Sequence, residues 1–389
     1  MTASLRILFL APQPFFEVRG TPLAVLAMVR ALTGLGHRVE LLTYPQGAPV
    51  DVAGLVHRRS LRLPVGRVKA GPSMAKLLLD VPFLVQAVFL LSTRRYDVVH
   101  AVEEAAHLVS PFTRLLGIPL VADVDSSIPD QLRYSGFATR GPLLWAAEAL
   151  ERHALSSSAA VITVCTSLTE AVMRRAPEAR TFQIEDPPLV DEASRSEPEA
   201  AAALRRDLGL GPEPVVLYSG NFEAYQGVAL LVDAAALVPR AQIVFMGGEP
   251  FEIAALGKRA AQAGARCAFA GKRPPTDLPA FLAMADVLVS PRTKGENTPF
   301  KIYTYLASGK PIVATRITSH TQLLDDSMAF LVEPTSQALA AGIAHALDAP
   351  EEATARAGRG RDLVERQYSP ARYAEKVKRA YDAVAARIP

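Results

Sequence analysis

The amino-acid sequence predicts an α/β protein built from two doubly wound parallel-sheet domains. The chain has 389 residues, more than one ordinary core holds, because domains average about 150 residues. Short apolar runs alternate with longer helical patterns, and the alternation starts again after a passage at residues 185–214 that contains two adjacent prolines and a Gly-Leu-Gly-Pro turn. We therefore expect domains at residues 1–186 and 187–368, followed by a closing segment at residues 369–389.

The first domain begins with a strand–helix–strand unit. Apolar runs predict strands at residues 6–10 and 38–43, and the helical pattern between them covers residues 22–35. Pro22 suits a first helical turn and Gly36 suits a helix end, and such a crossover is right-handed when the strands are parallel. The same alternation predicts four more strands in this domain, at residues 98–102, 119–124, 160–164 and 180–184.

The second domain repeats this alternation. Its predicted strands are residues 215–219, 242–247, 267–270, 287–290, 311–315 and 329–332. The last helix, residues 370–386, carries an apolar stripe at helical spacing, which we expect to pack back on the first domain. Ligands of doubly wound sheets bind at the carboxyl ends of the strands, so functional residues are expected in the strand-to-helix loops, in a cleft between the domains.

Composition and charge limit the classes of function. Half of the residues are hydrophobic, 21% are charged and the net charge is only +3, which is typical of a globular enzyme and does not indicate a nucleic-acid partner. Cys165 and Cys267 lie far apart, as expected in a reducing compartment. The apolar run at residues 7–11 is too short for a signal peptide, so we expect a cytoplasmic protein. The longest apolar stretch, residues 77–91, is interrupted by polar residues and should not span a membrane.

A basic segment precedes that apolar stretch. Residues 52–79 contain no acidic residue, which predicts peripheral contact with the inner face of a membrane through residues 58–91. The alternative is a flexible basic loop before an ordinary buried helix, and the sequence does not separate the two. The basic residues are Arg58, Arg59, Arg62, Arg67, Lys69 and Lys76.

The segment from Ser290 to Thr315 carries most of the chemical information. Its loop presents cationic and polar side chains and leads into a helix near Pro299, so backbone amides, a helix N-terminus and cations converge where an anion could bind. The alternative is a solvated loop that caps the helix with Asn297 or Thr298. The polar side chains of the loop are those of Arg292, Lys294, Glu296, Asn297 and Thr298.

This segment resembles the donor-site signature of glycosyltransferase family 4. Glu296 occupies the position of the first family Glu, and residues 307–315, Ala-Ser-Gly-Lys-Pro-Ile-Val-Ala-Thr, match the Gly-x-Pro-Val-Val-Ala end of the signature. The second family Glu, eight positions later, binds the donor ribose, and here it is Thr304. The resemblance implies the GT-B fold, in which two Rossmann-like doubly wound parallel-sheet domains face a central cleft.

The resemblance extends over nearly the whole chain. Arg19-Gly20-Thr21-Pro22 resembles the N-terminal glycine loop of the family, and Asp97-Val-Val-His100 resembles a family strand motif. In the second domain, residues 218–227 lie where the family has Gly-Arg and a later Lys-Gly that balance the donor diphosphate. Gly220 is kept, whereas Asn221 and Gln226 replace the two cations. Arg292 and Lys301 are our candidates to supply that charge, with Lys294 as a further donor-site residue.

The resemblance implies a retaining hexosyl transfer from a nucleotide sugar to a glycan or lipid-linked acceptor in cell-surface polysaccharide or glycolipid synthesis, without metal or cofactor. Glu296 would position the donor sugar. We expect Glu296 and Arg292 to lie outside the core, so that alanine at either position lowers transfer and leaves the fold intact. The implied acceptor-side residues are Arg19, Gly20, Thr21, His100 and Asp125.

Several residues and motifs allow a second interpretation. Asp125 could cap a helix, His100 could be a buried structural residue, and Glu103 and Glu104 could be a base or solvated helix starts. Asp123-x-Asp125 resembles the metal motif of another glycosyltransferase fold, and we do not expect it to bind metal. A weakened paralogue that binds without turnover and a nucleotide-sugar epimerase stay open as functions. A dehydrogenase is disfavoured because no Gly-x-Gly-x-x-Gly turn follows the first strand.

Overall fold

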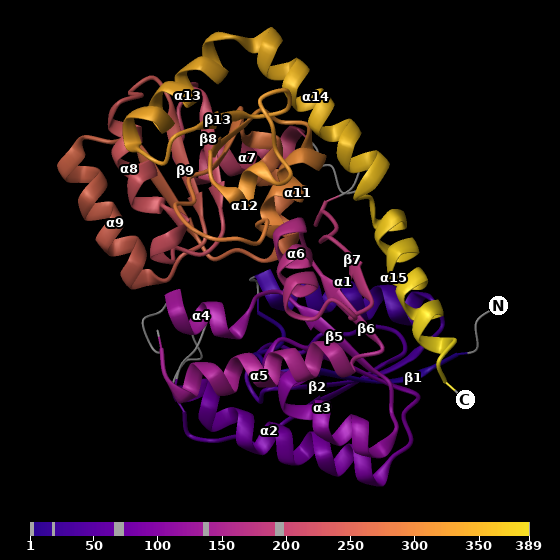
Figure 1. Cartoon of the computed structure of the whole chain (residues 1–389). Coiled ribbons are helices and arrows are strands. Elements are labelled where there is room, and N and C mark those ends of the chain that lie inside the picture. The colour runs from indigo at the N-terminus through magenta and orange to yellow at the C-terminus, as the bar shows by residue number, and fades with distance from the viewer. Residues whose placement is uncertain (1–3, 18–19, 66–73, 135–139, 191–197, 389) are drawn as a thin grey trace. The chain divides into compact units, whose positions relative to one another are not determined.

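The computed structural model describes residues 4–17, 20–65, 74–134, 140–190 and 198–388. The chain forms two compact units, one of Met1–Asp186 with Tyr373–Pro389 and one of Pro187–Arg372 (Figure 1). Each unit holds one parallel sheet covered by helices on both faces. The predicted pair of doubly wound α/β domains is therefore confirmed.

The first unit contains a seven-stranded sheet in the order β3-β2-β1-β4-β5-β6-β7. Alternate side chains of the interior strand β1 point to opposite faces: Ile7 and Phe9 enter one core cluster, and Leu8 and Leu10 enter the other. Burial on both faces explains the continuous apolar run. The strands are β1 Arg6–Ala11, β2 Arg38–Thr43, β3 Leu55–Arg59, β4 Val98–Val102, β5 Leu120–Val124, β6 Ala160–Thr163 and β7 Thr181–Gln183.

Strand β3 was not predicted. It pairs with β2 along its whole length and forms the edge of the sheet. An edge strand is half covered, and Val56 is 53% exposed while Arg58 and Arg59 carry charge, so no buried apolar run marks it in the sequence.

Helices cover both faces of the first sheet. The terminal helix α15 places Tyr373, Val377 and Tyr381 in the core cluster that also contains residues of α1. Residues of α2, α3, α5 and α6 enter the cluster on the opposite face. The helices of this unit are α1 Gly20–Gly34, α2 Met74–Thr93, α3 Glu104–Leu116, α4 Ile128–Tyr134, α5 Pro142–Ser157, α6 Thr166–Arg175 and α15 Pro370–Ala385.

Helix α2 extends beyond the apolar stretch predicted at residues 77–91. It runs for 20 residues, and among the described helices it alone has the length and apolar composition of a membrane span. The helix continues through the polar interruptions. The Asp80 carboxylate accepts a hydrogen bond from the Tyr44 hydroxyl, and Pro82 lies inside the continuous helix. Buried side chains along one face, among them Leu79, Phe83 and Ala87, pack in the core of the first unit.

The second unit contains a six-stranded sheet in the order β10-β9-β8-β11-β12-β13, and all six strands were predicted. The strands are β8 Val215–Ser219, β9 Gln242–Met246, β10 Cys267–Gly271, β11 Val287–Ser290, β12 Ile312–Thr315 and β13 Phe330–Val332. The helices are α7 Pro198–Asp207, η2 Ala224–Gln226, α8 Val228–Ala236, α9 Pro250–Ala263, η3 Pro275–Asp277, α10 Leu278–Met284, α11 Phe300–Ser308, α12 Thr318–Thr321, α13 Ser336–Asp348 and α14 Pro350–Gln367.

Candidate functional site

In the second sheet, the strand order reverses between β8 and β11. Strands β9 and β10 follow on one side of this pair, and β12 and β13 on the other. Doubly wound sheets bind ligands at the carboxyl ends of the strands, beside such a reversal. These loops, residues 220–227 and 291–299, hold most of the predicted donor-site residues. The fold therefore brings together two segments that lie some seventy residues apart in the sequence.

The two loops are fastened to each other through backbone atoms. The Thr293 amide donates a 2.8 Å hydrogen bond to the carbonyl oxygen of Tyr225. Gly227 has φ +70°, and a Cβ there would overlap the carbonyl oxygen of Pro291. Only glycine allows the two loops to come this close. This explains why the residue directly after Gln226 is a glycine.

Lys301 lies at the centre of the predicted donor residues. It stands in the first turn of α11, with its Nζ 3.9 Å from the centroid of the Tyr218 ring and 3.4 Å from Oε1 of Gln226. A Cβ on Gly220 would lie 2.7 Å from this Nζ, so the ammonium fills the corner that the glycine leaves open. Burial and the charge of Arg292 lower the pKa of Lys301 well below its ordinary value. Burial and Arg292 thus disfavour the charged form of Lys301, and an anion bound here would stabilise it.

Arg292 has a different environment from the predicted one. It is buried, with 7% of its surface exposed, and its guanidinium donates hydrogen bonds to the carbonyl oxygens of Lys294 and Asn297 and to Oδ1 of Asn297. The same group lies 5.1 Å from the centroid of the Tyr225 ring. The expectation that Arg292 lies outside the core was wrong, because the loop folds around its side chain.

The start of α11 has no side-chain cap. Its N-cap is Pro299, which supplies no side-chain cap, so neither Asn297 nor Thr298 caps this helix within the described residues. The Asn297 side chain accepts from Arg292, and Thr298 is buried. Within the first turn, the Ile302 amide donates a 2.9 Å hydrogen bond to the carbonyl oxygen of Pro299. Phe300 and Lys301 precede it at the positive end of the helix dipole, where a phosphate is favoured.

Glu296 and Lys294 are exposed at the tip of the loop after β11. The Gln322 side chain donates a 2.7 Å hydrogen bond to the backbone carbonyl of Glu296 and so fixes the chain at this point. The Glu296 carboxylate is thus carried by an anchored backbone.

Asn221 and Thr304 have structural partners. The backbone carbonyl oxygen of Asn221 accepts a 2.6 Å hydrogen bond from the Tyr218 hydroxyl. Its side-chain oxygen accepts a 3.3 Å hydrogen bond from the Glu223 amide. Thr304 is 1% exposed, and its hydroxyl accepts the amide of Leu189 at 3.0 Å. The prediction that Thr304 contacts the donor is therefore corrected, because its hydroxyl is buried against the chain.

Two aromatic residues were missed as site residues. Tyr218 lies beneath Lys301 and Tyr225 beneath Arg292, so each cation of the predicted pair rests on a ring. The available signal was the presence of tyrosines at the end of strand β8 and in the loop after it, next to the two positions where cations are lost.

In the first sheet, the order reverses between β1 and β4, which places the start of α1 near the end of β5. Gly20 and Thr21 open α1, and the Thr21 hydroxyl donates a hydrogen bond to Asp125. Burial and the nearby carboxylates of Asp123 and Glu103 raise the pKa of Asp125 well above its ordinary value. Burial likewise raises the pKa of Asp186 to about 8. Arg19 lies outside the described residues.

His100 belongs to the core of the first unit and not to an exposed acceptor surface. Its ring is fully buried and stacks on Phe9 with centroids 4.1 Å apart. Its Nδ1 lies 2.8 Å from the Tyr381 hydroxyl and its Nε2 lies 3.0 Å from Oδ2 of Asp123. Both nitrogens are engaged, so the prediction of an acceptor-side role is corrected. The histidine joins β4, β5 and α15.

Glu103 and Glu104 are held by neighbours. Among described residues other than glycine, Glu103 alone has a positive φ, 49°, and its carboxylate accepts the Ser126 hydroxyl at 2.8 Å. Glu104 pairs with Lys76, and burial raises the pKa of Glu104 to about 7. Neither is a solvated helix start. Across the described ranges, no group of three or more His, Cys, Asp or Glu side chains is placed to hold a metal ion.

Family models match both units. A model described as "Glycosyl transferase 4-like domain" matches residues 19–187, and one described as "Glycosyl transferases group 1" matches residues 213–349. The chain belongs to the family-4-like glycosyltransferases. This membership agrees with the resemblance of the donor-site segment.

Two named transferases are similar in sequence to this glycosyltransferase. The chain is 27% identical over 257 residues to an alpha-D-kanosaminyltransferase of Streptomyces kanamyceticus, covering 61% of this chain and 64% of that protein. It is 23% identical over 314 residues to the sulfoquinovosyl transferase SQD2 of Arabidopsis thaliana, covering 79% of this chain and 59% of that protein. The chain thus spans less than two thirds of the length of either relative.

Solved structures support the fold of this glycosyltransferase. A sucrose-phosphate synthase from Thermosynechococcus elongatus superposes with a TM-score of 0.80 at 20% identity, over 98% of this chain and 99% of that chain. Anabaena HepE in complex with UDP-glucose superposes with a TM-score of 0.75 at 18% identity, over 97% and 100% of the two chains. Both likenesses show that the chain has the GT-B type of fold.

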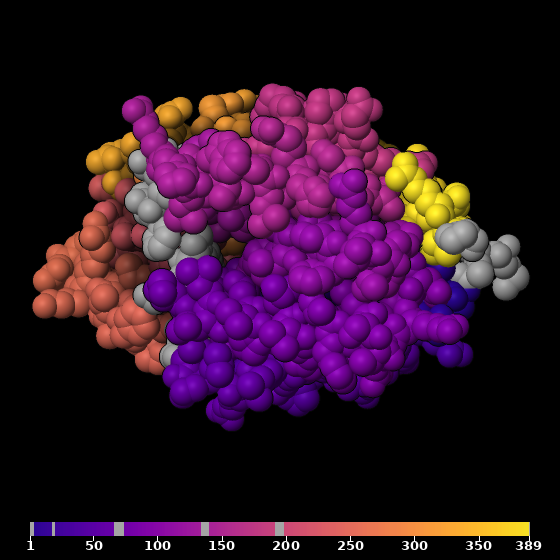
Figure 2. Space-filling model, turned by 60° about the horizontal axis from the view of Figure 1, so that its bottom comes forward, coloured from indigo at the N-terminus to yellow at the C-terminus, as the bar shows by residue number. Residues whose placement is uncertain are grey.

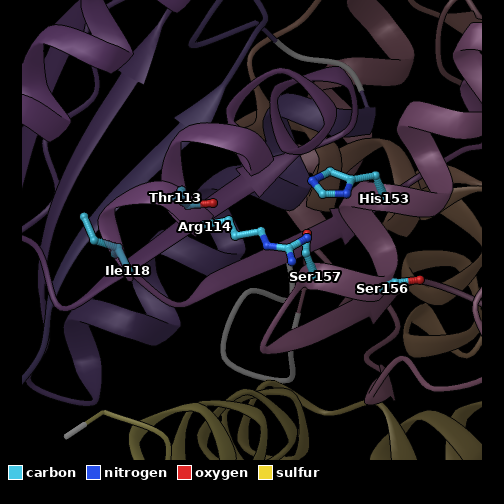
Figure 3. Close-up of a pocket in the computed structure, with 6 residues that line it drawn as sticks. All are labelled: Thr113, Arg114, Ile118, His153, Ser156 and Ser157. Atoms are coloured by element: carbon cyan, nitrogen blue, oxygen red, sulfur yellow. The ribbon is translucent and has the colours of Figure 1, made fainter.

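A pocket of about 300 Å³ in the first unit does not belong to the candidate site of the glycosyltransferase (Figure 3). Its lining comes from the end of α3 and the end of α5, which precede β5 and β6. It therefore lies at the amino ends of the strands, opposite the edge where doubly wound sheets bind ligands. The lining residues are Thr113, Arg114, Ile118, His153, Ser156 and Ser157.

Proposed function

We propose that the protein is a retaining glycosyltransferase that moves a hexosyl group from a nucleoside-diphosphate donor to a glycan or lipid-linked acceptor. The observation that carries this proposal is the Lys301 ammonium beside the uncapped start of α11, between the loops after β8 and β11. The names of the two relatives as glycosyl transferases and the UDP-glucose in HepE support it.

Negative charge develops on the leaving diphosphate as the anomeric bond breaks. Lys301 and the first-turn amides of α11 would neutralise that charge without a metal, while the buried Arg292 holds the loop in shape. Glu296 would bind the donor sugar and favour positive charge at the anomeric carbon. The acceptor hydroxyl would attack from the face that the diphosphate leaves, which retains the configuration. Gly20, Thr21 and Asp125 are the acceptor-side residues of this proposal.

Nucleotide binding should depend on pH through Lys301. A bound diphosphate favours the ammonium, so the pKa of Lys301 in the complex must exceed its lowered pKa in the free protein. The affinity for the nucleotide is then highest below the pKa that Lys301 has in the free protein. It falls as the pH rises from that value toward the pKa of Lys301 in the complex, by at most about tenfold per pH unit. Titration calorimetry with UDP in buffers of different ionisation enthalpy measures the accompanying proton uptake. The absence of proton uptake across the accessible pH range would contradict this assignment.

Glu296→Gln should lower kcat by about 100-fold, because the amide keeps the shape of the side chain but loses the charge that favours the transition state. The exposed position of Glu296 means that the melting temperature should not change by more than about 1 °C. The matched control is Glu351→Gln, which removes an exposed carboxylate at the start of α14 in the same unit. Steady-state kinetics and thermal melts check both variants. Equal loss in the two variants would remove the assignment.

The proposed activity is tested by thermal shifts with UDP-, GDP-, TDP- and ADP-sugars, followed by product analysis of the sugar that stabilises the fold. Slow release of free sugar with a retained anomer supports the transferase. Binding without turnover indicates a paralogue that has lost activity, and an isomerised nucleotide sugar indicates an epimerase. No shift with any nucleotide sugar would overturn the proposal.

A further inference from the structure

One face of helix α2 is an uninterrupted apolar surface. Six of its side chains are each more than half exposed, and their spacing of three or four residues places them on one side of the helix. Figure 2 turns the side of the first unit that carries α2 toward the viewer. We call these residues the α2 stripe: Met74 63%, Leu77 54%, Leu78 52%, Val81 64%, Val85 65% and Phe89 61% exposed.

The opposite face of α2 is fixed to the first unit. Its buried apolar residues belong to the core cluster beside the sheet. Its two charged residues face neighbours, since Lys76 pairs with Glu104 and Asp80 accepts the Tyr44 hydroxyl. Neither charge therefore interrupts the α2 stripe. If α2 crossed a bilayer, its buried residues would leave the core of the first unit, and Lys76 and Asp80 would enter the hydrocarbon region. Helix α2 can therefore contact a membrane only with its exposed face. The core residues of α2 are Leu79, Phe83, Ala87, Leu90 and Leu91.

The chain around α2 is strongly basic. Residues 52–96 contain eight Lys and Arg residues and one acidic residue, Asp80, which is turned toward Tyr44. Beyond the end of the helix, Arg94 shares Glu40 with Arg58 of β3, and Arg95 is exposed. Arg59 and Arg62 are exposed as well. Arg67 and Lys69 of the predicted basic segment lie outside the described residues.

We infer that the α2 stripe lies in the interface of an anionic phospholipid bilayer, with the surrounding arginines near the headgroups. Apolar side chains at this spacing suit the boundary between headgroups and acyl chains, and cations close to them in the sequence suit anionic lipid. The stripe lacks the polar groups that give protein interfaces their hydrogen bonds, which disfavours a protein partner. The inference rests on α2 and the basic residues near it in the sequence, and it does not depend on the proposed transfer reaction.

Vesicle flotation tests the inference on the full chain. The wild type should float with vesicles of 30% phosphatidylglycerol in phosphatidylcholine and bind at least tenfold more weakly to pure phosphatidylcholine. Val81→Glu with Val85→Glu should reduce binding to the anionic vesicles at least tenfold and leave nucleotide binding unchanged. The matched control Leu237→Glu changes a side chain that is 54% exposed at the end of α8 and should bind like the wild type. Equal binding by all three proteins would overturn the inference.

A second measurement separates insertion from attraction by charge alone. Val85→Cys labelled with an environment-sensitive fluorophore should shift to the blue on anionic vesicles, because the label enters an apolar phase. Selective labelling is feasible because Cys165 is buried and burial raises the pKa of Cys267 to about 12. A label that stays in water while the protein floats would refute insertion. If the double glutamate variant instead abolishes a dimer seen by analytical ultracentrifugation without vesicles, the stripe binds a second copy and the inference fails.

Discussion

Replacing Lys301 by methionine is expected to lower kcat/KM for transfer by about 100- to 1000-fold, because it removes the one cation placed against Gly220 and Gln226 in the described loops. Methionine keeps most of the length of the side chain and can still lie on the Tyr218 ring. The loss should therefore come from the missing charge, and the affinity for UDP should fall with it. Calorimetry of UDP binding and steady-state kinetics measure the two effects.

The stability of the same variant distinguishes binding from folding. The lowered pKa of Lys301 means that its ammonium is held at a cost in the free protein, so methionine should leave the melting temperature unchanged or raise it. Lys258→Met is the matched control, since Lys258 is exposed on α9 of the same unit and its loss should change kcat/KM by less than about fivefold. A Lys301→Met protein that melts earlier yet turns over normally would show that the ammonium serves the fold.

The alternation of buried strands and helices was enough to predict both sheets, because parallel strands in the middle of a sheet are apolar on both faces. It missed β3, whose exposed edge carries Val56 and charged residues in place of a buried run. It also did not give the full length of α2, because Asp80 and Pro82 interrupt the apolar pattern in the sequence but lie within one continuous helix. Local composition cannot show which polar residues have a buried partner.

The candidate site shows the same limit. The loop after β11 could be found from its polar residues and from the family signature, and Lys301 lies beside Gln226 of the loop after β8. His100 and Thr304 were assigned to substrates, yet each is buried with a hydrogen-bond partner far away in the sequence, Tyr381 and Leu189. Such partners are set by tertiary packing, so a single sequence carries no local sign of them.

Arg292→Ala is expected to lower both activity and stability, in contrast to the Lys301 variant. The guanidinium satisfies two backbone carbonyls and one side-chain oxygen of its own loop, and these groups would lose a buried donor. We expect a loss of about 3 kcal/mol in the free energy of unfolding and at least about 1000-fold in kcat/KM, because the loop that carries Glu296 would no longer be fixed. Urea unfolding followed by circular dichroism, together with kinetics, measures both.

Asn297→Ala provides the comparison that isolates the guanidinium. It removes only the side-chain acceptor and keeps the carbonyl oxygen of residue 297, so it should cost about 1 kcal/mol and less than about tenfold in kcat/KM. If Arg292→Ala instead unfolds at the wild-type urea concentration and loses only UDP affinity, Arg292 contacts the diphosphate directly. The loop would then have to release its guanidinium when the nucleotide binds, and Asn297→Ala, by weakening that hold, should raise the affinity for UDP.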